Sequence, residues 1–469
     1  MDLLGVPIDE LLPALMFLAL GFLLFTGYPV AMMVAGVGVY FGLIGWAFGV
    51  FRPAHYEALA NRIWGGIAEN PVLVAIPMFI FMGTMLEKSG VARDLLNTLN
   101  ILLRRVPGGL ALAVSLLGTI MAATTGIIGA SVVMLTLLAL PVMMQSGYSN
   151  RLSTGIIAAS GTLGILIPPS IMLVIMADLL SITVGNLFVA AIVPGLLLAA
   201  VYLVYIVVLA MVRPKVAPRL PADVGPDTNR DLFLLVLRSF IPPVFLIVLV
   251  LGSIFGGWAT PTEASGVGAA GAVLLALFNR KLKWRTLCEV VQRSALTNAM
   301  LFFIFVGATA FSYIFRRLGG EQLVIDLIEY LAFGPWGLLF VLMLIVFLLG
   351  FFFDWIEITL IVLPVFTPII AHLDLGHHVD SPMANAVTYW FAILIAVNLQ
   401  TSFLTPPFGF ALFYMRGVAP PQVSLKDIYL GIIPFVLLQL LVLAAVILFP
   451  GLALWLPEWY SAQPAPVGG

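Results

Sequence analysis

Charged residues are scarce in this chain. Asp, Glu, Lys and Arg together make up 9% of its 469 residues, whereas 62% are hydrophobic and the mean hydropathy is +1.15. Soluble domains carry about 25% charged residues, so this composition excludes a soluble globular protein. Apolar runs of roughly 20 residues recur along the chain, a pattern typical of an all-α polytopic membrane protein embedded in a lipid bilayer.

Other features are missing as well. The single cysteine, Cys288, excludes an internal disulfide. The first ten residues contain no Lys or Arg and so lack the basic region of a cleavable signal, and we expect the first apolar run to remain as a helix. No HExxH or Walker A motif occurs, and the four histidines fall in expected loops. We therefore expect neither an enzyme nor an ATP-driven pump, and no nucleic-acid partner.

Two apolar stretches are interrupted by residues that end helices. The first, GTLGILIPPS, breaks a predicted span at 150–180 over residues 161–169, and the second, NLQTSFLTPPFG, breaks a predicted span at 383–415 over residues 398–407. In hydrocarbon, each backbone group freed by such a break costs several kcal/mol unless it finds a partner. Either the Pro-Pro pairs kink structural helices, or the freed backbone lines a site.

Two longer apolar stretches, 107–144 and 335–370, are interrupted near their centres. The interruptions read TTGIIGAS and GFFFDWIEIT, with predicted tips near Gly126–Ser131 and Gly350–Asp354. Each stretch forms either two spans or one re-entrant hairpin. Both alternatives leave the orientation of every later span unchanged.

The basic residues indicate the orientation. With hairpins and an outside N-terminus, 17 of the 21 basic residues lie inside, in agreement with the positive-inside rule. Both termini are then periplasmic. The four basic residues left outside are Arg52, Arg62, Arg316 and Arg317.

The two halves of the chain match each other in order. Proline falls on proline where GYPVAMMV matches ATPTEASG, and FIFMG matches FIFVG, TLLALPV matches TLIVLPV and IPPSIMLVIM matches TPPFGFALFY, at offsets between 223 and 240. Each half has five crossings, so the second half is inverted relative to the first. Inverted repeats with interrupted helices in matching positions place a solute site near the midplane of the bilayer.

The repeat predicts six segments. In chain order they are scaffold helices of repeat 1 (1–106), the first transport-domain half (107–212), a cytoplasmic linker (213–236), scaffold helices of repeat 2 (237–334), the second transport-domain half (335–450) and a periplasmic tail (451–469).

Small and hydroxyl-bearing residues at the tips and breaks suit a sodium ion, which needs five or six oxygens and no proton-transfer group. Backbone carbonyls freed by unwinding would supply most of these oxygens. The predicted sodium ligands of the first half are Gly126, Ala130, Ser131, Ser160, Gly161 and Gly164. Those of the second half are Gly350, Asp354, Asn398, Thr401, Ser402 and Thr405. The predicted substrate contacts are Ser131, Thr162, Asp354, Thr401 and Thr405.

Two carboxylates, Asp354 and Glu357, lie three residues apart in the second tip. Ionisable groups inside a membrane are costly and usually functional. Asp354 either gates a cation or substrate, or caps the second helix of the hairpin, since Asp is a favoured N-cap residue. The first half has no ionisable group at its tip or break.

The stretch AASGTLGILIPPSIMLVI, followed by VPGLLLAAVY and later by NLQTSFLTPPFGFALFY, resembles the large membrane subunit of tripartite ATP-independent periplasmic (TRAP) transporters, over about residues 10–450. The resemblance implies an elevator-type secondary transporter of the bacterial inner membrane, driven by a sodium gradient. It also implies three partners: an organic acid substrate, a periplasmic binding protein that delivers it and a separate small four-helix membrane subunit.

One departure from the family pattern concerns the first tip. Many members carry a tip rich in serine and threonine, whereas TGIIGASVV keeps Gly126, Ala130 and Ser131 but has fewer hydroxyls. This departure shifts ion ligation there toward carbonyl groups. The alternative functions are a channel and a stand-alone sodium- or proton-coupled carboxylate symporter of the same superfamily.

Overall fold

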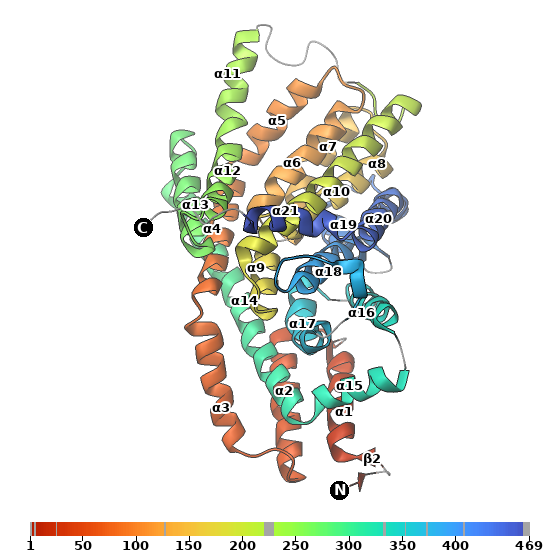
Figure 1. Ribbon diagram of the computed structural model, residues 1–469. Coiled ribbons are helices and arrows are strands. Elements are labelled where there is room, and N and C mark those ends of the chain that lie inside the picture. Colours follow the sequence, from red (N-terminus) through yellow and green to blue (C-terminus); the bar gives the residue numbers. More distant parts are fainter. Residues whose placement is uncertain are drawn as a thin grey trace.

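The computed structural model describes residues 2–3, 6–24, 26–125, 128–219, 229–331, 334–351, 353–371, 374–406 and 409–462. Regular structure in these ranges is helical apart from two short antiparallel strands, β1 (Asp2–Leu3) and β2 (Val6–Pro7). Nine of the described helical segments are long and apolar enough to cross a membrane. The predicted all-α polytopic membrane fold is therefore confirmed (Figure 1).

The first half contains ten α-helices and three short helical turns. They are α1 (Ile8–Leu24), α2 (Val30–Ala47), α3 (Ala54–Ile63), η1 (Trp64–Ala68), η2 (Pro71–Val74), α4 (Ala75–Lys88), α5 (Val91–Leu103), α6 (Gly109–Thr125), α7 (Ile128–Gln145), α8 (Asn150–Thr162), η3 (Leu163–Ile165), α9 (Ile171–Leu179) and α10 (Val184–Val212).

The second half contains eleven α-helices and one short turn. They are α11 (Asn229–Ser239), α12 (Ile241–Phe255), α13 (Pro261–Phe278), α14 (Trp284–Arg317), α15 (Gly320–Leu331), α16 (Pro335–Leu349), α17 (Trp355–Ala371), η4 (Gly376–Val379), α18 (Ala386–Leu404), α19 (Phe410–Val418), α20 (Leu425–Leu448) and α21 (Gly451–Ser461).

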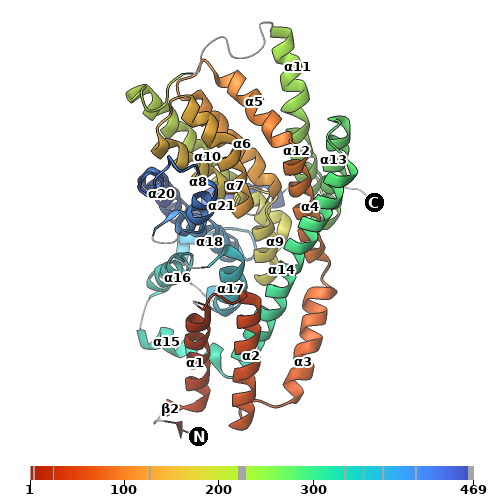
Figure 2. The same cartoon turned by 180° about the vertical axis from the view of Figure 1, so that it is seen from behind.

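The packing of four scaffold helices follows the internal repeat. The sequence matches pair α2 with α13 and α4 with α14, and in the structure α2 packs along α14 while α13 packs along α4. Small residues permit both contacts: a Cβ atom at Gly307 would lie 2.6 Å from the Ala31 carbonyl oxygen, and one at Gly268 would lie 2.7 Å from the Met82 sulfur. The two contacts lie toward opposite ends of the molecule, as expected for an inverted repeat (Figures 1 and 2).

The two interrupted stretches form helix pairs, which we call hairpin 1 (α6 and α7) and hairpin 2 (α16 and α17). Each pair turns back near its predicted tip, and the two helices of each pair pack together. Gly126 lies outside the described residues, as do Ile127 beside it and Phe352 in the second tip.

Both predicted helix breaks are present, and we call α8–η3–α9 broken helix 1 and α18–α19 broken helix 2. The first break agrees with the prediction, since α8 ends at Thr162 and α9 begins at Ile171. The second was predicted too early, because α18 remains helical through Leu404. No proline or glycine occurs in that helix before Pro406, and the proline forces only the preceding residue, Thr405, into an extended conformation.

Several short helices were not predicted. They are α3, α5, α11, α15 and α21. Hydropathy detects spans, whereas these segments mix apolar and polar residues and lie outside the long apolar runs. Within the segment predicted as a periplasmic tail, 451–469, α21 is helical and packs along α10. Part of the predicted linker, residues 220–228, lies outside the described residues.

Candidate functional site

Hairpin 1 lies directly against broken helix 1. A Cβ atom at Gly118 in α6 would overlap Ser160 in the last turn of α8. A Cβ atom at Gly161 would lie 2.5 Å from Cγ2 and 3.2 Å from Cα of Val132, the residue that follows Ser131. These glycines allow the hairpin backbone to approach the break closely. The structure therefore brings the predicted ligands Ser131, Ser160 and Gly161 into one neighbourhood.

Hairpin 2 makes the equivalent contact with broken helix 2. Gly350 ends α16, and a Cβ atom there would overlap the Ser402 hydroxyl in α18. Asn398 fixes the same two helices, because its amide nitrogen donates to the Met343 carbonyl of α16 at 2.7 Å. Gly350 and Ser402 thus lie in contact, whereas Asn398 binds α16 seven residues before Gly350, and its amide nitrogen already has a structural partner.

The two halves interlock through the second segment of each broken helix. Segment α9 packs against α17 of hairpin 2, and α19 packs against α7 of hairpin 1 (Figure 1). A Cβ atom at Gly129, near the first tip, would lie 2.7 Å from the ring of Tyr414 in α19. Tyr414 is also close enough to Asp354 and Glu357 for their charges to act on it. The two tips therefore converge on broken helix 2.

Most of the predicted hydroxyl ligands donate to a carbonyl of their own helix. Such a bond uses the hydrogen and leaves lone pairs on the oxygen, so the hydroxyl can still face a cation. The bonds run from Thr162 to Ala159 (2.9 Å), from Thr401 to Val397 (3.2 Å), from Ser402 to Leu399 (2.8 Å) and from Thr405 to Thr401 (2.7 Å).

Three buried polar side chains in this region have atoms without a hydrogen-bond partner in the described structure. They are the hydroxyls of Ser160 and Thr359 and both ends of the Gln400 amide, and each residue is at most 1% exposed. An unsatisfied buried polar group costs about 1–3 kcal/mol. These groups therefore mark a place where a solute, an ion or water would complete the structure.

Gln400 and Thr359 were missed by sequence reasoning. Gln400 lies inside the quoted motif NLQTSFLTPPFG, and a polar amide within an apolar span could have marked it as a candidate site residue. It lies two residues from Asn398 and from Ser402, which places it on the opposite side of α18 from the face that meets hairpin 2. Thr359 gave no local signal, because only packing shows that its hydroxyl lacks a partner.

The two carboxylates of the second tip form an N-terminal cap. The Trp355 N–H donates to the Asp354 carboxylate at 2.7 Å, and the Asp354 N–H donates to the Glu357 carboxylate at 3.1 Å. The capping role foreseen for Asp354 is therefore present, because its carboxylate accepts a first-turn N–H, while Glu357 accepts the N–H of Asp354 itself. Glu357 also borders a cavity of about 230 Å³ that is otherwise lined by apolar side chains and Gly21 of α1.

The remaining predicted ligands sit at helix ends. Ala130 and Ser131 lie in the first turn of α7, Gly164 lies in η3, and Thr405 follows α18. The carbonyl groups in the last turn of α8 and α18 lie where helix dipoles favour a cation. No cluster of three or more His, Cys, Asp or Glu side chains is found among the described residues, so the region offers mainly neutral oxygens.

Comparison with known proteins agrees with this arrangement. Residues 16–452 match the family "Tripartite ATP-independent periplasmic transporter, DctM component". The chain is 32% identical to the C4-dicarboxylate TRAP transporter large permease protein DctM of Pseudomonas aeruginosa, over 87% of this chain and 91% of that protein. It is 30% identical to the isethionate TRAP transporter permease protein DctMQ of Oleidesulfovibrio alaskensis, over 89% of this chain and 64% of that protein.

A solved structure shows a related fold. The YdaH transporter of Alcanivorax borkumensis, described as having an unusual topology, superposes with a TM-score of 0.61 over 98% of this chain and all of the other, at 14% identity. The fold is thus that of a membrane transporter. Because the family match covers nearly the whole chain, the chain belongs to the DctM component family of the tripartite ATP-independent periplasmic transporters, and it is a large permease subunit rather than an enzyme.

Proposed function

We propose that this permease imports a small organic acid with a sodium gradient, and that both solutes bind where the hairpin tips meet the broken helices. The observation that carries the proposal is that each hairpin lies on a broken helix, that α9 and α19 interlock the two halves, and that α8, α17 and α18 hold buried polar atoms without a partner in the described structure. Carbonyl oxygens at helix ends and hydroxyl oxygens would hold sodium. Ser131, Thr162, Asp354, Thr401 and Thr405 would contact the substrate.

Sodium fits this region better than a proton does. Proton coupling usually needs a relay of titratable groups inside the membrane. The described part of hairpin 1 and broken helix 1 carries one carboxylate and no histidine. The carboxylate is that of Asp178, at the far end of α9, and it is hydrogen-bonded to Asn70 at 2.7 Å. Hairpin 2 adds only Asp354 and Glu357, which cap α17.

We propose an elevator motion for the transport step. Helix α5 links α4 to hairpin 1, and α15 occupies the same place between α14 and hairpin 2. Both are short and carry polar residues, and they lie toward opposite ends of the molecule (Figure 2). Such connectors suit arms at the two membrane surfaces, about which residues 107–212 and 335–450 would move against the scaffold.

The proposed partners are a small four-helix membrane subunit and a periplasmic binding protein. The relative named DctMQ supports the first, since more than a third of that protein lies outside the part that matches this chain. The second follows from the binding-protein-dependent transport that the family resemblance implies. We place the complex in the bacterial inner membrane, with both termini of this chain in the periplasm.

Uptake by proteoliposomes tests the proposal. Large and small subunits with the binding protein should take up its ligand under an inward sodium gradient, and Thr162→Ala and Thr401→Ala should each raise the sodium concentration for half-maximal uptake. Thr98→Ala is the matched control, because its hydroxyl makes the same bond to its own helix, to Asp94 at 2.8 Å, but in α5. Equal sodium dependence in all three variants would contradict the sodium assignment.

The alternative is a stand-alone symporter of the same superfamily. Saturable uptake of free succinate by the membrane subunits alone, unchanged when the binding protein is added, would support that alternative and contradict delivery by a binding protein.

A further inference from the structure

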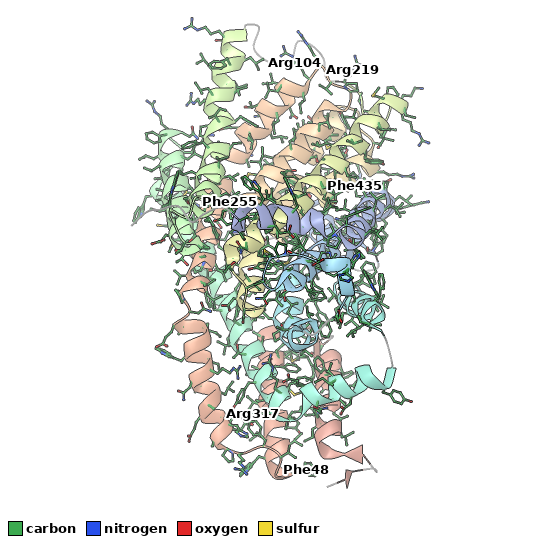
Figure 3. The ribbon with its side chains drawn as sticks, viewed as in Figure 1. Phe48, Arg104, Arg219, Phe255, Arg317 and Phe435 are labelled. Carbon is green, nitrogen blue, oxygen red and sulfur yellow. The ribbon has the colours of Figure 1, made fainter. Side chains whose placement is uncertain are left out.

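A second cavity lies at the far end of broken helix 1 from its break, where α14 faces α9 and α17. Its volume is about 530 Å³, and α3, η1 and α15 complete its walls. It lies toward the end of the molecule that holds the N-terminus. Figure 3 shows Arg317 near Phe48 at that end, whereas Arg104 and Arg219 lie at the other.

Two arginines flank Tyr313, which lines this cavity, and one of them, Arg62, lines it as well. The guanidinium carbons of Arg62 and Arg317 lie 5.6 and 5.5 Å from the centre of the Tyr313 ring. A ring face attracts a guanidinium group but occupies few of its N–H donors, which stay available to an anion. Tyr313 lines the cavity, is 5% exposed, and its hydroxyl has no hydrogen-bond partner in the described structure.

The remaining arginines on this side of the molecule join the same cluster. Burial, followed by the charges of Arg317 and Arg52, holds the pKa of His55 below its usual value, so both arginines lie near this imidazole. Arg316 lines the cavity as well. These four residues (Arg52, Arg62, Arg316 and Arg317) form what we call the arginine cluster. They are all the basic residues that the sequence analysis assigns to the periplasmic side.

The arginine cluster is not neutralised within the described residues. None of the ion pairs there includes one of its four members. Asp178 and Glu321 line the same cavity, but neither lies within 4 Å of an arginine nitrogen. One oxygen of Asp178 accepts a hydrogen bond from Asn70 at 2.7 Å. The cavity lining thus holds two guanidinium groups, of Arg62 and Arg316, and two carboxylates that are not ion-paired with them.

One arginine connects this cavity to hairpin 2. Arg316 donates to the Pro364 carbonyl of α17 at 2.8 Å. That carbonyl would ordinarily accept the N–H four residues later in the helix, but residue 368 is proline and has none. Arg316 therefore satisfies an acceptor that the helix itself leaves free, and the cavity wall is shared by α14 and hairpin 2.

We propose that the arginine cluster and the Tyr313 hydroxyl form a second anion site, which receives the carboxylate of the substrate before it reaches the broken helices. This role rests on the proposed function, whereas the binding of a small carboxylate at this place does not. The site would take the anion on the periplasmic side, next to the hairpin that must accept it.

Thiol labelling of the assembled complex tests the site without relying on transport. In a Cys288→Ser background, Ser312→Cys places a thiol on the cavity wall. An anionic methanethiosulfonate reagent should react faster than its cationic counterpart. Arg62→Gln and Arg317→Gln should each lower this ratio roughly threefold or more. Arg285→Gln, at the opposite end of α14, is the matched control and should leave the ratio unchanged.

Succinate is the probe for binding. It should slow labelling by the anionic reagent, whereas mannitol at the same concentration should not, and Tyr313→Phe should weaken this protection while keeping the reagent preference. Absence of a preference for the anionic reagent, or equal protection by mannitol, would overturn the site. Protection by the binding protein alone, with none by succinate, would overturn it in favour of a protein-docking surface.

The experiments distinguish a failure of the proposed transport function from a failure of the anion site. Protection by succinate in a complex that shows no sodium-driven uptake would contradict the proposed function and leave the anion site standing. Sodium-driven uptake with no protection by succinate would contradict the anion site alone.

Discussion

The contact between Gly350 and Ser402 offers a sharp test of how hairpin 2 sits on broken helix 2. Gly350 has φ −65° and ψ −8°, which alanine adopts readily, so the backbone itself tolerates Gly350→Ala. The new Cβ atom would overlap the Ser402 hydroxyl and lie 2.5 Å from the Ser402 Cβ atom. Since ordinary contacts begin near 3.4 Å, the tip must move by about 1 Å.

Overpacking of this size costs typically about 1–3 kcal/mol. If the bound state needs the tip on the break, this cost should appear as a roughly fivefold to hundredfold increase in the sodium concentration for half-maximal uptake. Ser402→Gly removes both overlapping atoms, so Gly350→Ala should cause a much smaller further loss in the Ser402→Gly background than in the parent, as a double-mutant cycle measures. Gly266→Ala is the control, because nothing lies within 4 Å of its added atom.

The reasoning would be refuted if, for Gly350→Ala, the sodium concentration for half-maximal uptake stayed within about twofold of the parent value and the melting temperature stayed within about 1 °C. It would also be refuted if Ser402→Gly failed to relieve a loss that Gly350→Ala had caused.

Three further predictions concern other contacts. Gln400→Leu should abolish most uptake yet leave the melting temperature unchanged or higher, since it removes a fully buried amide without protein partners; a lower melting temperature would contradict a role in the site. Gly155→Val should destabilise the protein by about 1–3 kcal/mol in thermal unfolding, because its side chain would enter the backbone of α20, whereas Gly266→Ala should not. The Asp427 carboxylate accepts hydrogen bonds from the Ser424 hydroxyl at 2.6 Å and from the Ser424 N–H at 3.3 Å, and it accepts them more strongly as an anion than as a neutral acid. Asp427→Asn should therefore lower the melting temperature at pH 7 but not near pH 3, and an equal change at both pH values would contradict the cap.

Much of the fold could be predicted from the sequence because hydrocarbon imposes strict rules on it. Long apolar runs, the side preference of basic residues and matched prolines predict spans, orientation and repeat, and the structure pairs α2 with α14 and α4 with α13 as an inverted repeat requires. Short helices such as α3 and α21 escaped this reasoning. Each begins directly after a proline, Pro53 or Pro450, and α21 packs along α10, so hydropathy alone does not reveal them.

The candidate site was only partly predictable. Glycine, serine and proline at the breaks indicated where the backbone would be free, and Ser160, Gly161, Gly350 and Ser402 do lie at hairpin contacts. The extent of the second break could not be read from composition, because serine and threonine satisfy themselves within α18. The importance of Gln400 depends on the absence of a partner, which only three-dimensional packing reveals.

Substrate-coupled sodium flux tests the central claim most directly. Proteoliposomes holding the large and small subunits should take up radioactive sodium only when the binding protein and its ligand are present outside, and Thr162→Ala and Thr401→Ala should weaken this flux. If uptake of the ligand instead followed a pH gradient with sodium rigorously absent, and Asp354→Asn abolished it, coupling would belong to the carboxylate of hairpin 2 and the sodium account would be wrong.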